Sequence, residues 1–222
     1  MDRFITKAAA LIAAAAISFT AVSCSSEKKS EEKNAGAHQD HNMAAVSADD
    51  GDYTDYAETE LKPDTSDVPL MITFRKTFAT AEEAAKVAEF YYSISEKSVE
   101  YLESSVQPDV LKYKLDGSAE QEYLDAEYDY IKDTLVKDDY KFTAVTIDDD
   151  ASSDENISYY DSLLAKAAPD LKPTSKKVFK VNCLYEKGDG GQLSLAARLS
   201  ENNMDEIQVA VYTIDGKPYV IF

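Results

Sequence analysis

Apolar side chains recur at helical spacing between residues 80 and 135, and this pattern predicts three helices. Thr80 and Glu83 match a capping box, in which each side chain hydrogen-bonds the backbone amide of the other residue, and the helix extends to about residue 105. Pro108 begins a second, short helix. The third helix has a solvated face rich in charge. Its apolar face consists of Leu124, Tyr128, Ile131 and Leu135.

After residue 140 the pattern changes to the alternation that is typical of strands. One strand is predicted over 142–147, followed by an acidic loop over 148–156 and a helix that ends at Pro169. From Lys177 onward the alternation predicts an antiparallel meander, with turns at 188–191 and 215–216. The residues predicted to face inward are Phe179, Val181, Cys183 and Tyr185, then Leu193, Leu195, Ala197 and Leu199, then Ile207, Val209 and Val211.

This order of elements predicts an α+β fold, with N-terminal helices packed on a curved antiparallel sheet. The order over 70–222, and the closing phrase Asp-Gly-Lys-Pro-Tyr-Val-Ile-Phe at 215–222, are similar to those of the nuclear-transport-factor-2-like superfamily. That resemblance implies a cone-like sheet that wraps a long N-terminal helix and leaves a conical pocket. A cystatin-like α+β fold is the alternative.

The beginning of the chain has the pattern of a secretory leader. Arg3 and Lys7 precede an apolar run over residues 8–19, and small residues follow it. The run is too short to span a bilayer core, which requires about 20 apolar residues. Residues 1–23 are therefore predicted to be a signal peptide.

The residues Val22, Ser23 and Cys24 resemble the lipobox of bacterial lipoproteins, although Ala21 stands where leucine is usual. The resemblance implies that the Cys24 thiol receives a diacylglycerol and that Cys24 becomes the mature N-terminus. Two acyl chains hold a protein stably on a membrane. An ordinary signal peptide with an incidental cysteine is the alternative. The expected location is extracytoplasmic, lipid-anchored to the cell membrane.

Residues 24–67 contain almost no large aliphatic side chains, and we expect them to form a disordered polar tether. Residues 68–222 are then a single α+β domain. The formal net charge of −19 excludes nucleic acid as a partner, because an acidic surface repels phosphates. The expected partners are the membrane, through the lipid, and a small molecule or an envelope protein.

The chain offers few residues for catalysis or metal binding, and no cofactor is expected. Its two histidines, His38 and His41, lie in the tether, so the domain lacks Ser-His-Asp and Cys-His sets. This pair suits zinc or copper, but incidental histidines in a polar linker are the favoured interpretation. An acidic cluster suits calcium, although a solvated loop is favoured there as well. Its members are Asp148, Asp150, Asp154 and Glu155.

Aromatic residues are the remaining candidates for a binding site. The chain has 15 tyrosines and no tryptophan, and tyrosine combines an apolar ring with a polar hydroxyl. If the domain holds a pocket, its candidate lining is Tyr91, Tyr128, Phe179 and Tyr185. For Tyr91 and Tyr128, packing in the core is the favoured interpretation.

Three functional hypotheses follow. The sequence favours a non-enzymatic domain that binds a small molecule or a partner protein. The alternatives are an enzyme of the same cone fold, using aspartate and tyrosine for acid–base chemistry, and a structural module in envelope assembly. The space between the first helix and the sheet distinguishes them, because only the enzyme needs a pocket with a carboxylate in it.

Overall fold

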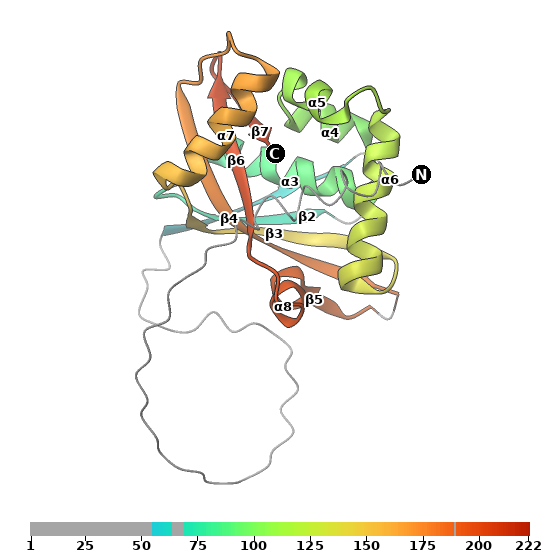
Figure 1. Cartoon of the computed structure of the whole chain (residues 1–222). Helices are drawn as coiled ribbons and strands as arrows, with labels where there is room; N and C mark the ends of the chain where they lie inside the picture. The colour runs from blue at the N-terminus through green and yellow to red at the C-terminus, as the bar shows by residue number, and fades with distance from the viewer. Residues whose placement is uncertain (1–54, 64–68, 189) are drawn as a thin grey trace, which may run out of the picture.

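The computed structural model describes residues 55–63, 69–188 and 190–222, which form six α-helices and a mixed sheet of seven strands (Figure 1). The strands are β1 (Tyr56–Leu61), β2 (Leu70–Arg75), β3 (Tyr140–Asp150), β4 (Ser175–Lys187), β5 (Gln192–Ser194), β6 (Ile207–Ile214) and β7 (Lys217–Ile221). The helices are α3 (Ala81–Glu96), α4 (Val99–Ser105), α5 (Pro108–Leu115), α6 (Glu120–Ile131), α7 (Asp154–Ala167) and α8 (Leu195–Glu201), with a π-helical segment, η2 (Lys132–Val136), after α6.

The α+β class is confirmed, but the sheet is mixed and not antiparallel throughout. Its strand order is β1-β2-β3-β4-β6-β7, with β5 paired to β4. β2 runs parallel to β3, while the other neighbouring strands are antiparallel. A parallel pair requires a long crossover connection, and helices α3 to α6 provide it.

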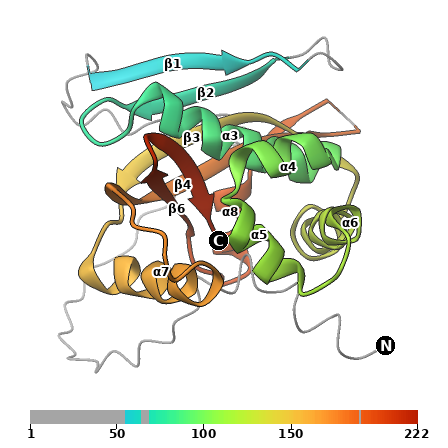
Figure 2. The ribbon, with the colours of Figure 1, turned by 90° about the horizontal axis from the view of Figure 1, so that it is seen from above.

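Helices cover both faces of the sheet, and two hydrophobic cores result. Helix α3 packs across the inner face (Figure 2), where the first core contains the alternating residues Phe179, Val181, Cys183 and Tyr185 of β4, as predicted. Helix α7 covers the opposite face of β4, β6 and β7, and the second core includes Tyr212 and Ile214. Residues 207–214 therefore alternate between two buried environments.

The predicted domain boundary at residue 68 is wrong, because β1 lies before it. This strand pairs with β2 in a continuous register from Tyr56 opposite Arg75 to Leu61 opposite Leu70. The Arg75 Nε donates a hydrogen bond to the Tyr56 hydroxyl at 2.7 Å, and Asp55 accepts two hydrogen bonds from Thr77. The sequence of residues 55–61 resembles the polar tether because β1 buries few apolar side chains.

The predicted helix over 80–105 is interrupted at Lys97, which has φ = 54°. The serines before it compete for backbone carbonyls, since the Ser93 hydroxyl donates to Phe90 O at 2.6 Å and the Ser95 hydroxyl to Tyr92 O at 3.5 Å. The chain restarts as α4, which brings Tyr101 edge-on to Tyr92. The capping box of Thr80 and Glu83 is confirmed.

The strand predicted around residues 193–199 is for the most part a helix. Only 192–194 pair as β5, and α8 follows immediately. The Ser194 hydroxyl caps α8 by accepting from the Ala197 amide at 3.2 Å, and Leu195 and Leu199 are buried one helical turn apart. Leu195 and Leu199 are four positions apart, so they would share a face in a strand as well as in a helix. The serine cap favours the helix.

The predicted acidic loop over 148–156 is also wrong in its first part. Asp149 and Asp150 pair with Lys180 and Phe179 as the end of β3. Helix α7 begins at Asp154, where the Ser153 hydroxyl accepts from the Asn156 amide. The tight turn at Asp215 and Gly216 is confirmed, since both residues have positive φ, as a hairpin turn of this length requires.

Candidate functional site

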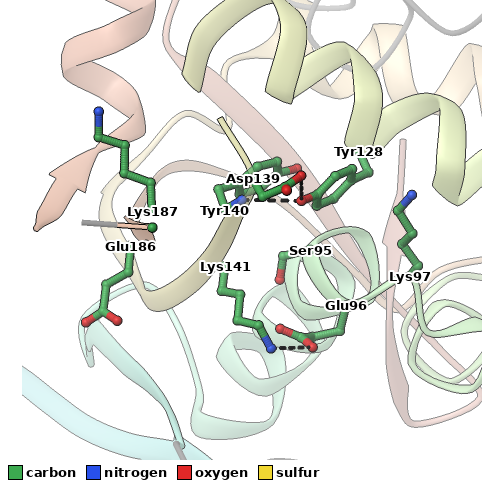
Figure 3. A pocket seen from close by; sticks show the side chains of 10 residues that line it. Ser95, Glu96, Lys97, Tyr128, Asp139, Tyr140, Lys141, Glu186 and Lys187 are labelled. Carbon is green, nitrogen blue, oxygen red and sulfur yellow. Dashed lines mark hydrogen bonds and ion pairs between the residues drawn. The ribbon is translucent and has the colours of Figure 1, made fainter. Parts of the chain in front are cut away.

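An open pocket of about 550 Å³ lies where the end of α3, the start of β3 and the end of β4 meet α6 (Figure 3). Charged side chains of both signs line it together with two tyrosines. The lining residues are Ser95, Glu96, Lys97, Tyr128, Asp139, Tyr140, Lys141, Glu186, Lys187 and Gly188. We call it the α3–β3 pocket.

Two stacked tyrosines form the aromatic wall of the α3–β3 pocket. The rings of Tyr128 and Tyr140 lie 4.7 Å apart at an angle of 9°. The Tyr140 backbone amide donates to the Tyr128 hydroxyl oxygen at 3.3 Å, and that hydroxyl donates to Asp139 Oδ1 at 3.2 Å (Figure 3). Helix α6 and the start of β3 are therefore held together at this wall.

Ion pairs surround the α3–β3 pocket on the solvent side. Lys141 lies 3.1 Å from Glu96, and the side chain of Lys141 is 68% exposed. Lys132 lies 2.5 Å from Asp139, whose side chain is 74% exposed. Exposed pairs of this kind contribute little to stability, typically about 0–1 kcal/mol, so they can exchange partners readily.

Lys97 is the cation that touches the aromatic wall directly. Its Nζ lies 4.4 Å from the centroid of the Tyr128 ring and 3.0 Å from Asp125 Oδ1. The hydrogen bond from Lys97 lowers the pKa of Asp125. The left-handed conformation that ends α3 places Lys97 at this position.

The local charges shift two further pKa values at the wall. The hydrogen bond from Lys132, with its positive charge, lowers the pKa of Asp139. Burial raises the pKa of Tyr128, although its hydrogen bond from the Tyr140 amide acts in the opposite direction. Asp139 is therefore a carboxylate and Tyr128 a neutral phenol at neutral pH.

A buried carboxyl lies next to the pocket wall in sequence. Glu127 is 1% exposed, and its Oε2 has no hydrogen-bond partner. Burial raises the pKa of Glu127 to about 8, against the opposing effect of the Lys114 charge. Glu127 is therefore largely protonated at neutral pH.

Of the four predicted pocket residues, only Tyr128 lines the α3–β3 pocket. Tyr91, Phe179 and Tyr185 are at most 3% exposed and belong to the first hydrophobic core. Tyr91 packs edge-on against Phe142. Helix α3 and the sheet thus meet through packed aromatic side chains at these positions. Phe179 and Tyr185 are therefore not pocket residues, and the favoured interpretation of Tyr91 as a core residue is confirmed.

The predicted metal ligands do not form a metal site within the part of the chain that the structure describes. Asp148 and Asp150 lie at the end of β3, and Asp154 and Glu155 lie in the first turn of α7. No group of three acidic, histidine or cysteine side chains in the described ranges could hold a metal ion. His38, His41 and Cys24 lie outside the described residues.

Cys183 is a fully buried thiol on β4, as its position among apolar neighbours predicted. Burial raises its pKa well above the ordinary value for cysteine. The thiolate is the reactive form, so Cys183 is unsuited to nucleophilic catalysis.

The spacing of apolar residues in α6 contains a signal that Glu127 is buried. Glu127 lies three residues after Leu124 and four before Ile131, which is the spacing of the buried face of α6. Asp139 and Lys141 gave no comparable signal, because polar residues at the start of a strand are common.

Comparisons of this chain with protein-family models, with curated proteins and with solved structures found no match. No relative therefore supplies a function by similarity. Among the residues that the structure describes, no helix combines the length and apolar character needed to cross a bilayer.

Proposed function

We propose that the chain is an extracytoplasmic lipoprotein, anchored by a lipid on Cys24, whose domain binds a short peptide or similar ligand in the α3–β3 pocket. The leader and the lipobox-like residues before Cys24 support the anchor. The observation that supports binding is the open pocket with its mixed charges and aromatic wall.

The charges that line the α3–β3 pocket favour a ligand that carries both signs. Three carboxylates, Glu96, Asp139 and Glu186, and three lysines, Lys97, Lys141 and Lys187, face the same space. Exposed ion pairs such as Lys141 with Glu96 lose little when each partner turns to a ligand group instead. A peptide with one acidic and one basic side chain can pair with a lysine and with a carboxylate of the pocket at the same time.

A nuclear-transport-factor-2-like arrangement is part of the same proposal. Its support is the long helix α3 packed on the inner face of the sheet, with β3, β4, β6 and β7 joined in antiparallel order. The strands β1 and β2 precede α3 and pair with each other in antiparallel fashion. Among the described strands, only the parallel β2–β3 pair departs from the predicted antiparallel sheet.

Binding is better supported than acid–base catalysis. The enzyme hypothesis needs a carboxyl that a substrate can reach inside the fold. Glu127 is the buried carboxyl beside the pocket wall, but it is 1% exposed and does not line the α3–β3 pocket.

The anchor is tested by replacing the lipidation residue. We expect Cys24→Ala to move the protein from the membrane fraction to the soluble fraction, while the control Cys183→Ala stays with the membrane. If Cys24→Ala remained membrane-bound, the lipoprotein proposal would fail.

The binding site is tested by calorimetry with the dipeptide Glu-Lys as the probe and Ala-Ala as the neutral reference. We expect binding of Glu-Lys that weakens at least about tenfold in Lys141→Ala, which is a loss of about 1.4 kcal/mol. Lys176→Ala is the matched control, because Lys176 forms a similar exposed ion pair with Asp161 away from the pocket. Absence of Glu-Lys binding, or equal loss in both variants, would contradict the proposal.

A further inference from the structure

Four buried polar atoms without hydrogen-bond partners lie in and around α6. They are Glu127 Oε2 and the hydroxyls of Tyr91, Tyr123 and Tyr140. Tyr91 comes from α3, Tyr123 and Glu127 from α6, and Tyr140 from β3. Buried polar groups are nearly always paired in folded proteins, so a set of four requires an explanation.

The groups that face Glu127 carry almost no charge. Lys114 of α5 is the charged side chain that acts on it, and Lys114 is partly buried itself, with its Nζ 5.3 Å from the Phe222 ring. Two phenols lie close enough to Glu127 to be affected by its charge, Tyr123 of α6 and Tyr140 of β3. Burial raises the pKa of both, and a negative charge on Glu127 raises it further.

The other elements in contact add neutral groups. Tyr91 of α3 interacts with Tyr123, and Cys183 of β4 interacts with Tyr91 and Tyr140. Helix α4 also packs against α6 but contributes no group that shifts the Glu127 pKa. Ionised Glu127 would therefore be a buried carboxylate with a single, incomplete counter-charge, which is unfavourable.

Tyr140 joins this buried cluster to the α3–β3 pocket. Its hydroxyl belongs to the buried set, while its ring stacks on Tyr128 and lines the pocket. Glu127 and Tyr128 are consecutive residues of α6, so a movement of this helix displaces both. The π-helical segment η2 follows α6 directly, and such segments interrupt regular helical hydrogen bonding.

We propose that Glu127 is a pH-dependent switch that sets the position of α6 and thereby the shape of the α3–β3 pocket. When Glu127 releases its proton to solvent, the carboxylate must gain donors, either by turning toward the Tyr123 and Tyr140 hydroxyls or by admitting water. Either change moves Tyr140 or α6, and both carry the aromatic wall of the pocket.

The expected range of the switch is close to neutral pH. With a Glu127 pKa of about 8, the carboxyl is mostly protonated at pH 6 and mostly ionised at pH 9. The functional consequence, control of ligand access, rests on the proposed function, but the structural change itself does not.

Hydrogen–deuterium exchange of the full chain in detergent micelles tests the switch without any ligand. Wild type and Glu127→Gln are compared with each other at pH 6 and again at pH 9. Because both proteins are measured at the same pH, the intrinsic pH dependence of amide exchange cancels in the ratio of their rates. We expect wild type to exchange faster than Glu127→Gln in peptides covering residues 120–131 and 139–141, and the ratio of the two rates to be at least about tenfold larger at pH 9 than at pH 6. The reason is that opening lets Glu127 return to its ordinary pKa and release its proton, which favours the opened state more as pH rises.

Two further variants make the outcome decisive. Glu122→Gln removes an exposed carboxylate from the same helix and should match wild type at both pH values. Lys114→Met removes the counter-charge, so the midpoint of the wild-type transition should move to higher pH. Equal exchange of wild type and Glu127→Gln at pH 9, or a difference confined to 120–131, overturns the proposal and leaves pocket binding itself untouched.

Discussion

Glu127 has a protonation state that links the stability of the domain to pH. Its pKa is about 8 when folded and 4.5 ordinarily, so between these values the folded protein retains a proton that the unfolded chain has released. Stability from this residue is therefore fully present below pH 4.5 and is lost as pH rises toward 8, by about 1.4 kcal/mol for each pH unit.

We predict that Glu127→Gln removes this dependence. The variant and wild type should have similar free energies of unfolding near pH 4.5, and the variant should be more stable at pH 8 by on the order of 4 kcal/mol. Urea denaturation followed by circular dichroism at several pH values measures the difference. Parallel curves for the two proteins would show that Glu127 is ionised in the folded state.

Cys183 gives a second prediction at the scale of a residue. Because the thiol is fully buried and its pKa is raised, we expect no reaction with an aromatic disulfide reagent in the native protein at pH 8. One thiol equivalent should react after denaturation, since Cys24 is expected to be lipidated. Rapid labelling of the native protein would contradict the burial of β4.

At the scale of elements, the N-terminus of α3 depends on its capping box. The Glu83 amide donates to the Thr80 hydroxyl at 3.2 Å, and the Thr80 amide donates to Glu83 Oε2 at 2.9 Å. Lys177 of β4 adds a contact of 2.8 Å to the same carboxylate, which ties the start of α3 to the sheet.

We predict that Thr80→Ala lowers the free energy of unfolding by about 1 kcal/mol, because it removes one of these hydrogen bonds. Ser98→Ala is the matched control. Ser98 occupies the same position in α4 but makes no capping hydrogen bond with its side chain, so its replacement should have little effect. Equal losses in a denaturation experiment would mean that the cap of α3 contributes nothing specific.

The elements that the sequence predicted well are those with a single strong period and a clear terminus. The short helix after Pro108 and the β4 alternation are examples. The apolar residues in 195–199 fit both the spacing of a strand and that of a helix. The Ser194 side chain favours the helix, because it caps α8 at the Ala197 amide and also donates a hydrogen bond to Asn182 of β4. β1 failed for a different reason, since its stability comes from pairing with β2 and not from its own apolar content.

The candidate site was less accessible to sequence reasoning than the fold. Tyr128 was identified as an aromatic side chain on a buried stripe, but its partners Asp139 and Tyr140 belong to a different element. The sequence alone does not predict that the left-handed end of α3 places Lys97 over the Tyr128 ring. Pockets between elements depend on such tertiary placement.

At the scale of the whole molecule, β1 decides where the folded domain begins. A chain that begins at residue 55 retains β1, whereas a chain that begins at residue 69 exposes the edge of β2 and removes the packing of Ala57 and Leu61 on the core. Exposed strand edges also promote association between molecules.

We predict that the chain beginning at residue 69 is less stable than the one beginning at residue 55, by on the order of 2 kcal/mol for the apolar contacts and edge hydrogen bonds lost. Denaturation midpoints measure the stability, and light scattering measures association. Identical midpoints would indicate that residues 55–63 are an accessory segment and that the domain begins at β2.

The last strand, β7, completes both cores. Phe222 packs between Phe90 and Tyr123, and Val220 O accepts from the Gln107 amide at 3.2 Å, next to an isolated bridge between Val106 and Val220. The helical layer thus lacks its final supports until β7 is in place. A polypeptide built in this way acquires its rigid form only after its last strand has joined the sheet.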